Sequence, residues 1–159
     1  MNSEHYSAEV VELENIRLVG KRISTAYATA AQDCPALWEN FSKEMHLCEI
    51  NEGCTTTRSF GVSIMTGPDS FDYMAAIESP VNGAIEGIHE LLLPKGTYLK
   101  CVCPGLDKIG EVFGFMYDGV WTRENTDFNL DFEKPCFEEY TEEYFKNGQL
   151  NIYAPLKGK

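Results

Sequence analysis

The stretch that decides the fold is FGVSIMTGPDSFDYMAAIES, residues 60–79. Two runs rich in β-branched, aromatic and other apolar residues flank the turn formers Gly67, Pro68 and Asp69. Apolar runs of this length on either side of a Gly-Pro-Asp cluster are typical of two strands joined by a turn. We therefore predict a β-hairpin over these residues.

The segments before the hairpin predict a strand and then a helix. Residues 10–24 carry β-branched residues and predict an extended segment, kinked at 14–15. A helix follows over about 33–48, because Asp33 suits its N-cap and Pro35 suits its first turn. Apolar residues then recur at helical spacing, namely Leu37, Phe41, Met45 and Cys48. The first half of the chain is thus strand, helix, hairpin.

The second half repeats this order. A strand, a second helix and two further strands with an Asn-Gly turn between them are predicted at 97–103, about 106–118, 136–142 and 150–156. Prolines and glycines within 80–96 indicate a connector. The polar stretch 121–133, with its interspersed aromatics, indicates a loop.

Two β-α-β-β units in succession indicate an α+β fold, with an antiparallel sheet and two main helices packed on one side. A length of 159 residues suits one domain, residues 1–159, with half-repeats over roughly 10–79 and 95–156. If the halves pair about a pseudo-twofold axis, the groove between them is the natural place for a central ligand pocket.

The composition of the chain limits the classes of partner that we expect. Thirteen basic residues against 25 acidic ones give a formal charge of −12, which repels phosphate backbones, so direct nucleic-acid binding is not expected. No apolar run reaches about 18 residues and the N-terminus lacks the features of a secretory signal, so we expect a cytoplasmic protein that does not span a membrane. The six cysteines fit free thiols, and neither a metal site nor a cofactor is expected.

The strand CFEEY, residues 136–140, carries two adjacent glutamates. Because side chains alternate along a strand, Phe137 and Glu139 share one face while Glu138 and Tyr140 share the other. Glutamates are mostly exposed, so the residues alone favour Phe137 inward and Glu138 in solvent.

Several segments together resemble one known family. They are RLVGKRIS (17–24), ALWENF (36–41), FDYMAAIES (71–79), LPKGTYLKCVCPG (93–105), FEEY (137–140) and IYAPLK (152–157). In order and spacing they resemble the effector-binding domain of GyrI-like proteins, which is also the drug-sensing half of AraC-type and MerR-type multidrug regulators. The resemblance covers nearly the whole chain.

The resemblance implies a duplicated β-α-β-β fold whose pocket is lined by aromatics and holds a buried glutamate from a Phe-Glu-x-Tyr strand. That glutamate is Glu138 here, accompanied by Tyr140, which leaves Glu139 as the exposed one. Tyr73 and Tyr98 match aromatic positions on pocket-side strands.

The family also tends to carry a tryptophan after the second helix, and Trp121 stands there, although the usual Trp-Leu-Pro is Trp-Thr-Arg in this chain. Each aromatic keeps a packing alternative. Trp121 can cap the second helix, Trp38 is expected in the core beside Leu37, and Tyr73, Tyr98 and Tyr153 can simply pack in the sheet.

Three functions follow from the resemblance. The first is stand-alone binding of lipophilic, often cationic aromatic molecules, for sensing or detoxification. Any control of transcription would then need a separate protein partner. The second is hydrolysis of strained cyclopropane rings in genotoxic natural products, with Glu138 activating water and Trp121 and Tyr140 holding the substrate. The third is inhibition of DNA gyrase by an acidic surface.

Overall fold

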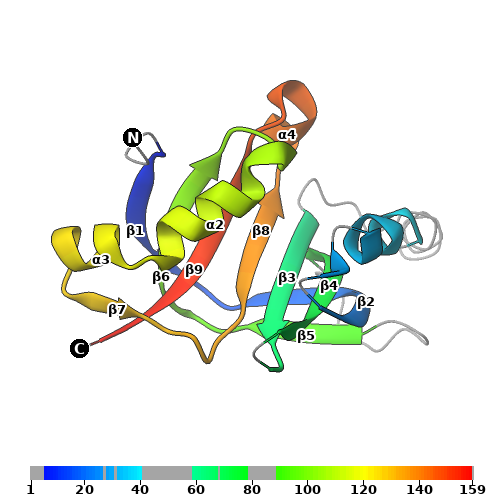
Figure 1. The fold of residues 1–159 in the computed structure, drawn as a ribbon, viewed down its shortest axis with the longest axis horizontal. Coiled ribbons are helices and arrows are strands. Elements are labelled where there is room, and N and C mark those ends of the chain that lie inside the picture. The colour runs from blue at the N-terminus through cyan, green and yellow to red at the C-terminus, as the bar shows by residue number, and fades with distance from the viewer. Residues whose placement is uncertain are drawn as a thin grey trace.

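The computed structural model describes residues 6–26, 28–30, 32–40, 59–67, 69–78 and 89–158 (Figure 1). The chain forms, in order, β1 (Ala8–Leu13), β2 (Ile16–Ala26), helical residues 32–40, β3 (Ser59–Met65), β4 (Ser70–Glu78), β5 (His89–Leu93), β6 (Gly96–Cys103), a short 3-10 turn (Leu106–Lys108), α2 (Ile109–Tyr117), α3 (Val120–Asn125), β7 (Phe128–Leu130), β8 (Cys136–Tyr140), α4 (Glu142–Asn147) and β9 (Leu150–Gly158).

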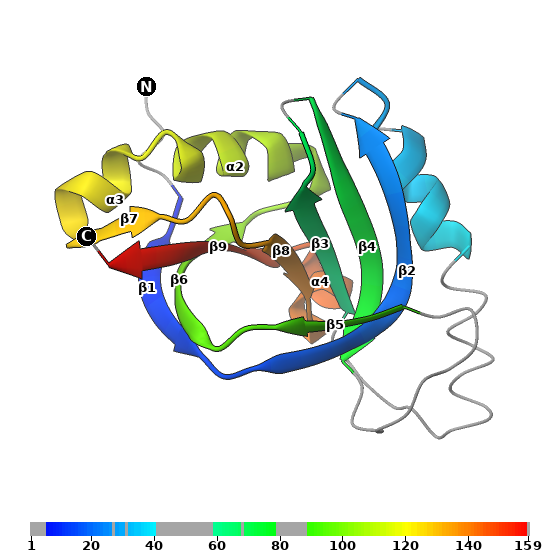
Figure 2. The same ribbon diagram turned by 90° about the horizontal axis from the view of Figure 1, so that it is seen from below.

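The strands pair antiparallel in the order β1-β6-β9-β8-β3-β4-β2-β5, with β7 added alongside β9. Figure 2 shows that the sheet curls strongly, with β1 running directly into β2 around the open side. The predicted α+β fold with an antiparallel sheet is confirmed.

The two β-α-β-β units are visible in the strand order. The first is β2, helix 32–40, β3 and β4, and the second is β6, α2, β8 and β9. Their strands lie in mirrored order on either side of the β3–β8 pair, where Gly61 stands directly opposite Glu138. The middle of the sheet is therefore the junction of the two halves.

Both faces of the sheet are covered. On the outer face, α2 packs over β6 and β9, and helix 32–40 packs over β2 and β4 through the buried Leu37 (Figure 1). The inner face is enclosed by the curl of the sheet itself and is filled by Phe60, Phe137, Tyr98 and other buried residues. Because both faces are covered, both glutamates of β8 are buried.

The N-terminal predictions hold where the structure describes them. The extended segment breaks between β1 and β2 at the predicted kink, and both strands of the hairpin form. The predicted helix is seen over 32–40, and its continuation to residue 48 lies outside the described residues. The predicted connector 80–96 was wrong at its end, because β5 pairs with β2 there, while 79–88 lie outside the described residues.

Two further loop predictions were wrong. Residues 121–133 contain most of α3 and all of β7, and β7 is anchored by pairing with the end of β9. The predicted turn before the last strand contains α4. The Thr141 side chain caps α4 by accepting a hydrogen bond from the Glu143 backbone N–H, and Gly148 ends it at a φ of 84°. These are ordinary helix start and stop signals, Thr at the N-cap and Gly after the last turn.

Candidate ligand-binding site

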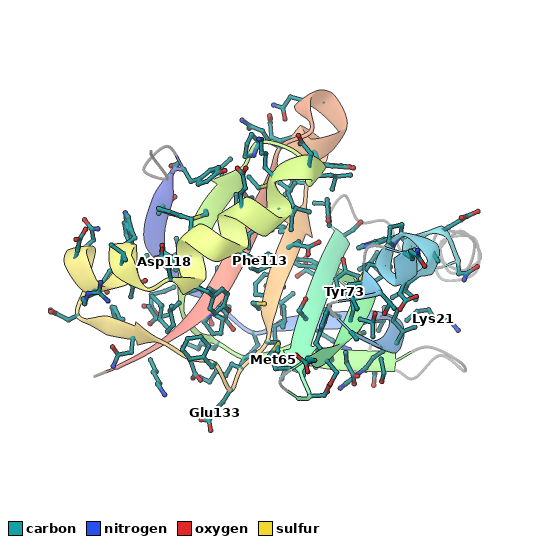
Figure 3. The ribbon with its side chains drawn as sticks, in the orientation of Figure 1. Lys21, Met65, Tyr73, Phe113, Asp118 and Glu133 are labelled. Atoms are coloured by element: carbon teal, nitrogen blue, oxygen red, sulfur yellow. The ribbon has the colours of Figure 1, made fainter. Side chains whose placement is uncertain are left out.

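Glu138 is the centre of the candidate site. It projects from β8 onto the outer, helix-covered face and is 6% exposed. Its Oε1 atom accepts a hydrogen bond of 2.6 Å from the Tyr140 hydroxyl and one of 3.1 Å from the Tyr73 hydroxyl. Tyr140 lies two residues further along β8, and Tyr73 comes from β4, two strands away. Figure 3 marks Tyr73 on this face beside helix 32–40.

A glycine makes room for this arrangement. Gly61 lies on β3, between β8 and β4, and a Cβ atom there would stand 2.1 Å from the Tyr73 hydroxyl oxygen and 2.8 Å from Glu138 Oε1. Because real Cβ atoms essentially never approach so closely, any other side chain at this position would displace the tyrosine, the carboxylate or both. The close approach of Tyr73 to Glu138 therefore depends on Gly61.

Helix 32–40 contributes a third aromatic side chain. The Trp38 indole N–H donates to the Tyr73 hydroxyl over 2.9 Å, and the indole ring meets the Tyr140 ring edge-on, with centroids 5.6 Å apart. One turn earlier, burial and the nearby charge of Glu138 raise the pKa of the partly buried Cys34 thiol to about 11. Cys34 and Trp38 thus share the helix face that is turned toward the carboxylate.

Within the described part of the chain, no positive charge compensates the carboxylate. Among the residues that the structure describes, no lysine, arginine or histidine forms an ion pair with Glu138, and its Oε2 atom accepts no hydrogen bond. Burial raises the pKa of Glu138, while the hydroxyls of Tyr140 and Tyr73 act in the opposite direction. An isolated buried carboxylate is costly to keep charged, so this group favours either a proton or an incoming cation.

The structure brings three of the predicted site residues together, Tyr73, Glu138 and Tyr140. It places the other two elsewhere. Trp121 lies on α3, partly buried against the cluster beneath α2, a group of buried residues that includes Met116 of α2, Cys101 of β6 and Ile152 of β9. Tyr98 faces the inside of the curl, where its hydroxyl donates to the Pro94 carbonyl and its ring meets other aromatics of the inner core.

Trp38 was expected in the core, and its indole does pack there, partly buried. Sequence analysis missed its contact with Tyr73 and Tyr140. The helical spacing that placed Leu37 toward the sheet could have found it, because the neighbouring residue then points to one side of the helix, over the centre of the sheet. The missing information was which strand lies under that side.

The prediction that Glu139 is exposed was wrong. Glu139 is also 6% exposed, and it projects to the inner face. Its Oε1 atom accepts hydrogen bonds from the Asn151 side-chain amide at 2.9 Å and from the Tyr153 hydroxyl at 3.0 Å, both on β9. The expectation assumed a sheet with one wet face, whereas the curl of this sheet encloses the second face as well.

A separate surface hollow of about 210 Å³ lies at the far edge of the sheet, lined by Arg17, Glu90, Leu91 and Leu92. It borders β2 and β5, whereas Glu138 stands on β8, and its Arg17–Glu90 ion pair is exposed. Surface exposure makes such a pair weak, so we do not take this hollow as the ligand site.

The curled antiparallel sheet with helices over its outer face defines an α+β class of domain. Comparison with known proteins gives the family. The model of the GyrI-like small-molecule-binding domain matches residues 7–157. The chain belongs to this GyrI-like family.

Solved structures agree with this assignment at the level of the fold. SAV2435 bound to tetraphenylphosphonium superposes with a TM-score of 0.71 at 17% identity, covering 96% of this chain and 94% of that one. The EcmrR C-terminal domain gives 0.69 at 15% identity, covering 98% and 99%. A putative transcription regulation protein from Staphylococcus aureus MU50 gives 0.67 at 18% identity, covering 96% and 99%.

No curated protein matches the chain in sequence. None of the helices in the described part of the chain is long and apolar enough to span a membrane.

Proposed function

We propose that this domain binds lipophilic aromatic cations and that Glu138 is the counter-charge of the ligand. The observation that carries the proposal is a buried carboxylate that is held by two tyrosine hydroxyls and has no ion-pair partner among the described residues. The tetraphenylphosphonium bound to SAV2435, a protein of the same fold, supports this choice of ligand class.

Physical chemistry favours a cation of this kind. A ligand with a delocalised positive charge loses little hydration on burial and supplies a counter-charge that no described residue gives Glu138. The hydroxyls of Tyr73 and Tyr140 hold the carboxylate, and Trp38 contacts both tyrosines. Each aromatic face adds about 0.5–2 kcal/mol of cation–π attraction when it contacts the charge. Flat rings tolerate different ligand shapes, so we expect affinity for several aromatic cations.

The test is isothermal titration calorimetry with tetraphenylphosphonium at neutral pH. We expect saturable binding to the wild-type protein and a loss of about 10–100-fold in Glu138→Gln, equivalent to about 1.4–2.8 kcal/mol. The matched control is Glu139→Gln, which neutralises the adjacent glutamate on the other face and should bind within about threefold of wild type. Neutral triphenylphosphine oxide should bind wild type and Glu138→Gln alike.

Two results would count against the proposal. One is the absence of saturable tetraphenylphosphonium binding by the wild-type protein. The other is equal affinity in wild type and Glu138→Gln, which would show that the ring surfaces act without the carboxylate.

The same carboxylate supports a second candidate, hydrolysis of strained cyclopropane rings. Glu138 has an Oε2 atom without a hydrogen bond among the described residues and a raised pKa, which suits a general base. Water would attack the ring carbon, forming a C–O bond while the strained C–C bond breaks. Glu138 would accept the proton from water and return it to the carbon that leaves with the electron pair.

Mass spectrometry after incubation with a cyclopropane-containing alkylating agent tests this reaction. A product heavier by one water, formed by wild type and not by Glu138→Gln, is the expected result of hydrolysis. Unchanged substrate at high protein concentration would leave binding as the function.

A further inference from the structure

We infer that Trp38 is the tryptophan that contacts the ligand at Glu138 and determines its selectivity for large aromatic cations. This inference rests on the proposed function, and it assigns the role to a different tryptophan from Trp121, the one that the family resemblance implied. The evidence is the network that joins the indole to the carboxylate.

The indole is one step away from the carboxylate through hydrogen bonds. The Tyr73 hydroxyl accepts from the Trp38 N–H and donates to Glu138 Oε1, so a single oxygen atom connects the two side chains. The other donor to Glu138, Tyr140, carries the ring that Trp38 meets edge-on at an interplanar angle of 77°. Trp38 therefore touches both tyrosines that hold the carboxylate.

The position of the indole on the sheet supports the same role. Trp38 packs against the cluster beneath helix 32–40 and also against the cluster beneath α2, so it lies across the junction of the two halves. Its neighbour Leu37 is buried against β2 and β4 and fixes the helix to the sheet. The indole is partly exposed.

Trp121 lacks these relations. It is partly buried on α3 against the cluster beneath α2. Among the described residues, its side chain makes neither a hydrogen bond nor a ring contact with Glu138, Tyr73 or Tyr140. The chain contains two tryptophans, so replacing either one leaves a protein with a single fluorescent reporter.

The experiment uses these two single-tryptophan proteins, Trp121→Phe and Trp38→Phe, titrated with tetraphenylphosphonium by fluorescence and calorimetry. Trp121→Phe should keep its affinity within about twofold and show a saturable change in the emission of Trp38. Trp38→Phe should lose about 5–10-fold in affinity, because the indole surface and the donor to Tyr73 are both lost. The emission of its remaining Trp121 should stay constant.

Two cations of different size distinguish direct contact between Trp38 and the ligand from a merely structural role of Trp38. Tetramethylammonium carries the same charge without aromatic groups, so its weaker binding should change less in Trp38→Phe than that of tetraphenylphosphonium. Equal losses for both ligands would mean that Trp38 only supports the fold. The fluorescence of Trp121→Phe gives an answer even if Trp38→Phe does not fold.

The possible failures are distinguishable. Wild-type protein that does not bind tetraphenylphosphonium refutes the proposed function, and this inference with it. Wild-type binding, together with full affinity in Trp38→Phe or an emission change that comes from Trp121, overturns this inference alone.

Discussion

Glu138 and Glu139 are neighbours on one strand with equal exposure, yet they belong to different parts of the molecule. Glu138 lies under the helices, and its partners come from β4 and from β8 itself. Glu139 lies inside the curl, and its partners Asn151 and Tyr153 both come from the adjacent strand β9. Glu138 connects the two halves of the fold, and Glu139 connects β8 to β9.

Burial alone does not distinguish the two glutamates, so the proposed ligand site rests on what surrounds Glu138. A glutamate tied to the next strand helps to fix register, because a slip of one residue would leave it and its donors unpaired in the core. Glu138 differs in that its surroundings include a helix, three aromatic rings and a neighbouring glycine without a side chain. The arrangement of the partners carries the functional information.

Of the variants that test the difference between the two glutamates, Gly61→Ala is expected to have the largest effect on stability and on ligand binding. The added methyl collides with Tyr73 and Glu138, so we expect a loss of about 2–3 kcal/mol in the free energy of unfolding and weak tetraphenylphosphonium binding. Chemical denaturation and calorimetry measure the two effects. The control is Gly114→Ala on α2. A Cβ atom added there meets nothing within 4 Å beyond the backbone of its own helix, so we expect a gain of about 0.5–1 kcal/mol in the free energy of unfolding. Equal stability of the two variants would contradict the close contact.

Glu139→Ala should come next, with a loss of about 2 kcal/mol in stability. It removes two hydrogen bonds and leaves the Tyr153 hydroxyl and the Asn151 amide without this acceptor in the interior. The affinity of the folded protein for tetraphenylphosphonium should stay near that of wild type. A large drop in affinity at temperatures where the variant is fully folded would show that the inner face takes part in binding.

Acidification should weaken cation binding in wild type by up to about tenfold per pH unit below the pKa of Glu138 in the free protein. That pKa is raised by burial, so the proton competes with the ligand, and binding at a pH near or below that pKa should release protons. Calorimetry in buffers with different ionisation enthalpies measures this release. Glu138→Gln should show neither the release nor the pH dependence, and a dependence that persists would assign it to another group.

The raised pKa of Glu138 makes the stability of the ligand-free protein depend on pH in the opposite direction from ligand binding. Because the folded-state pKa of Glu138 is higher than the unfolded-state value, its contribution to stability is full below the unfolded-state pKa and is lost as pH rises through the folded-state pKa. Higher pH should therefore lower the stability of free wild type relative to Glu138→Gln while it strengthens ligand binding.

The smallest effects are expected from a matched pair of tyrosine variants. Tyr140→Phe and Tyr153→Phe each remove one hydroxyl that donates to a buried glutamate, and each should cost about 1 kcal/mol of stability. Tyr140→Phe should in addition change the affinity for tetraphenylphosphonium by a few-fold, while Tyr153→Phe should leave it unchanged. Equal changes in affinity would remove the distinction between the two faces.

The elements with strong patterns were predictable from sequence. The hairpin around the Gly-Pro-Asp turn, the strand 97–103 and the helix after Gly105 were found because periodicity and turn residues agreed there. β5, α3, β7 and α4 were missed. They are short, and β5 and β7 are stabilised by pairing with strands distant in sequence, which local patterns do not reveal.

The candidate site was predictable in part. Alternation along 136–140 placed Glu138 and Tyr140 on one face, and the family resemblance chose that face. Trp38, Gly61 and the burial of Glu139 could not be derived in the same way. Each depends on how strands distant in sequence are placed side by side and on how far the sheet curls.

One consequence of the Gly61–Glu138 register concerns the mechanics of the domain. Glu138 receives one hydroxyl from each repeat, Tyr73 from the first and Tyr140 from the second, across a seam formed by β3 and β8. A ligand bound at this point would contact both repeats and link them. Binding should therefore alter how rigidly the two repeats move together.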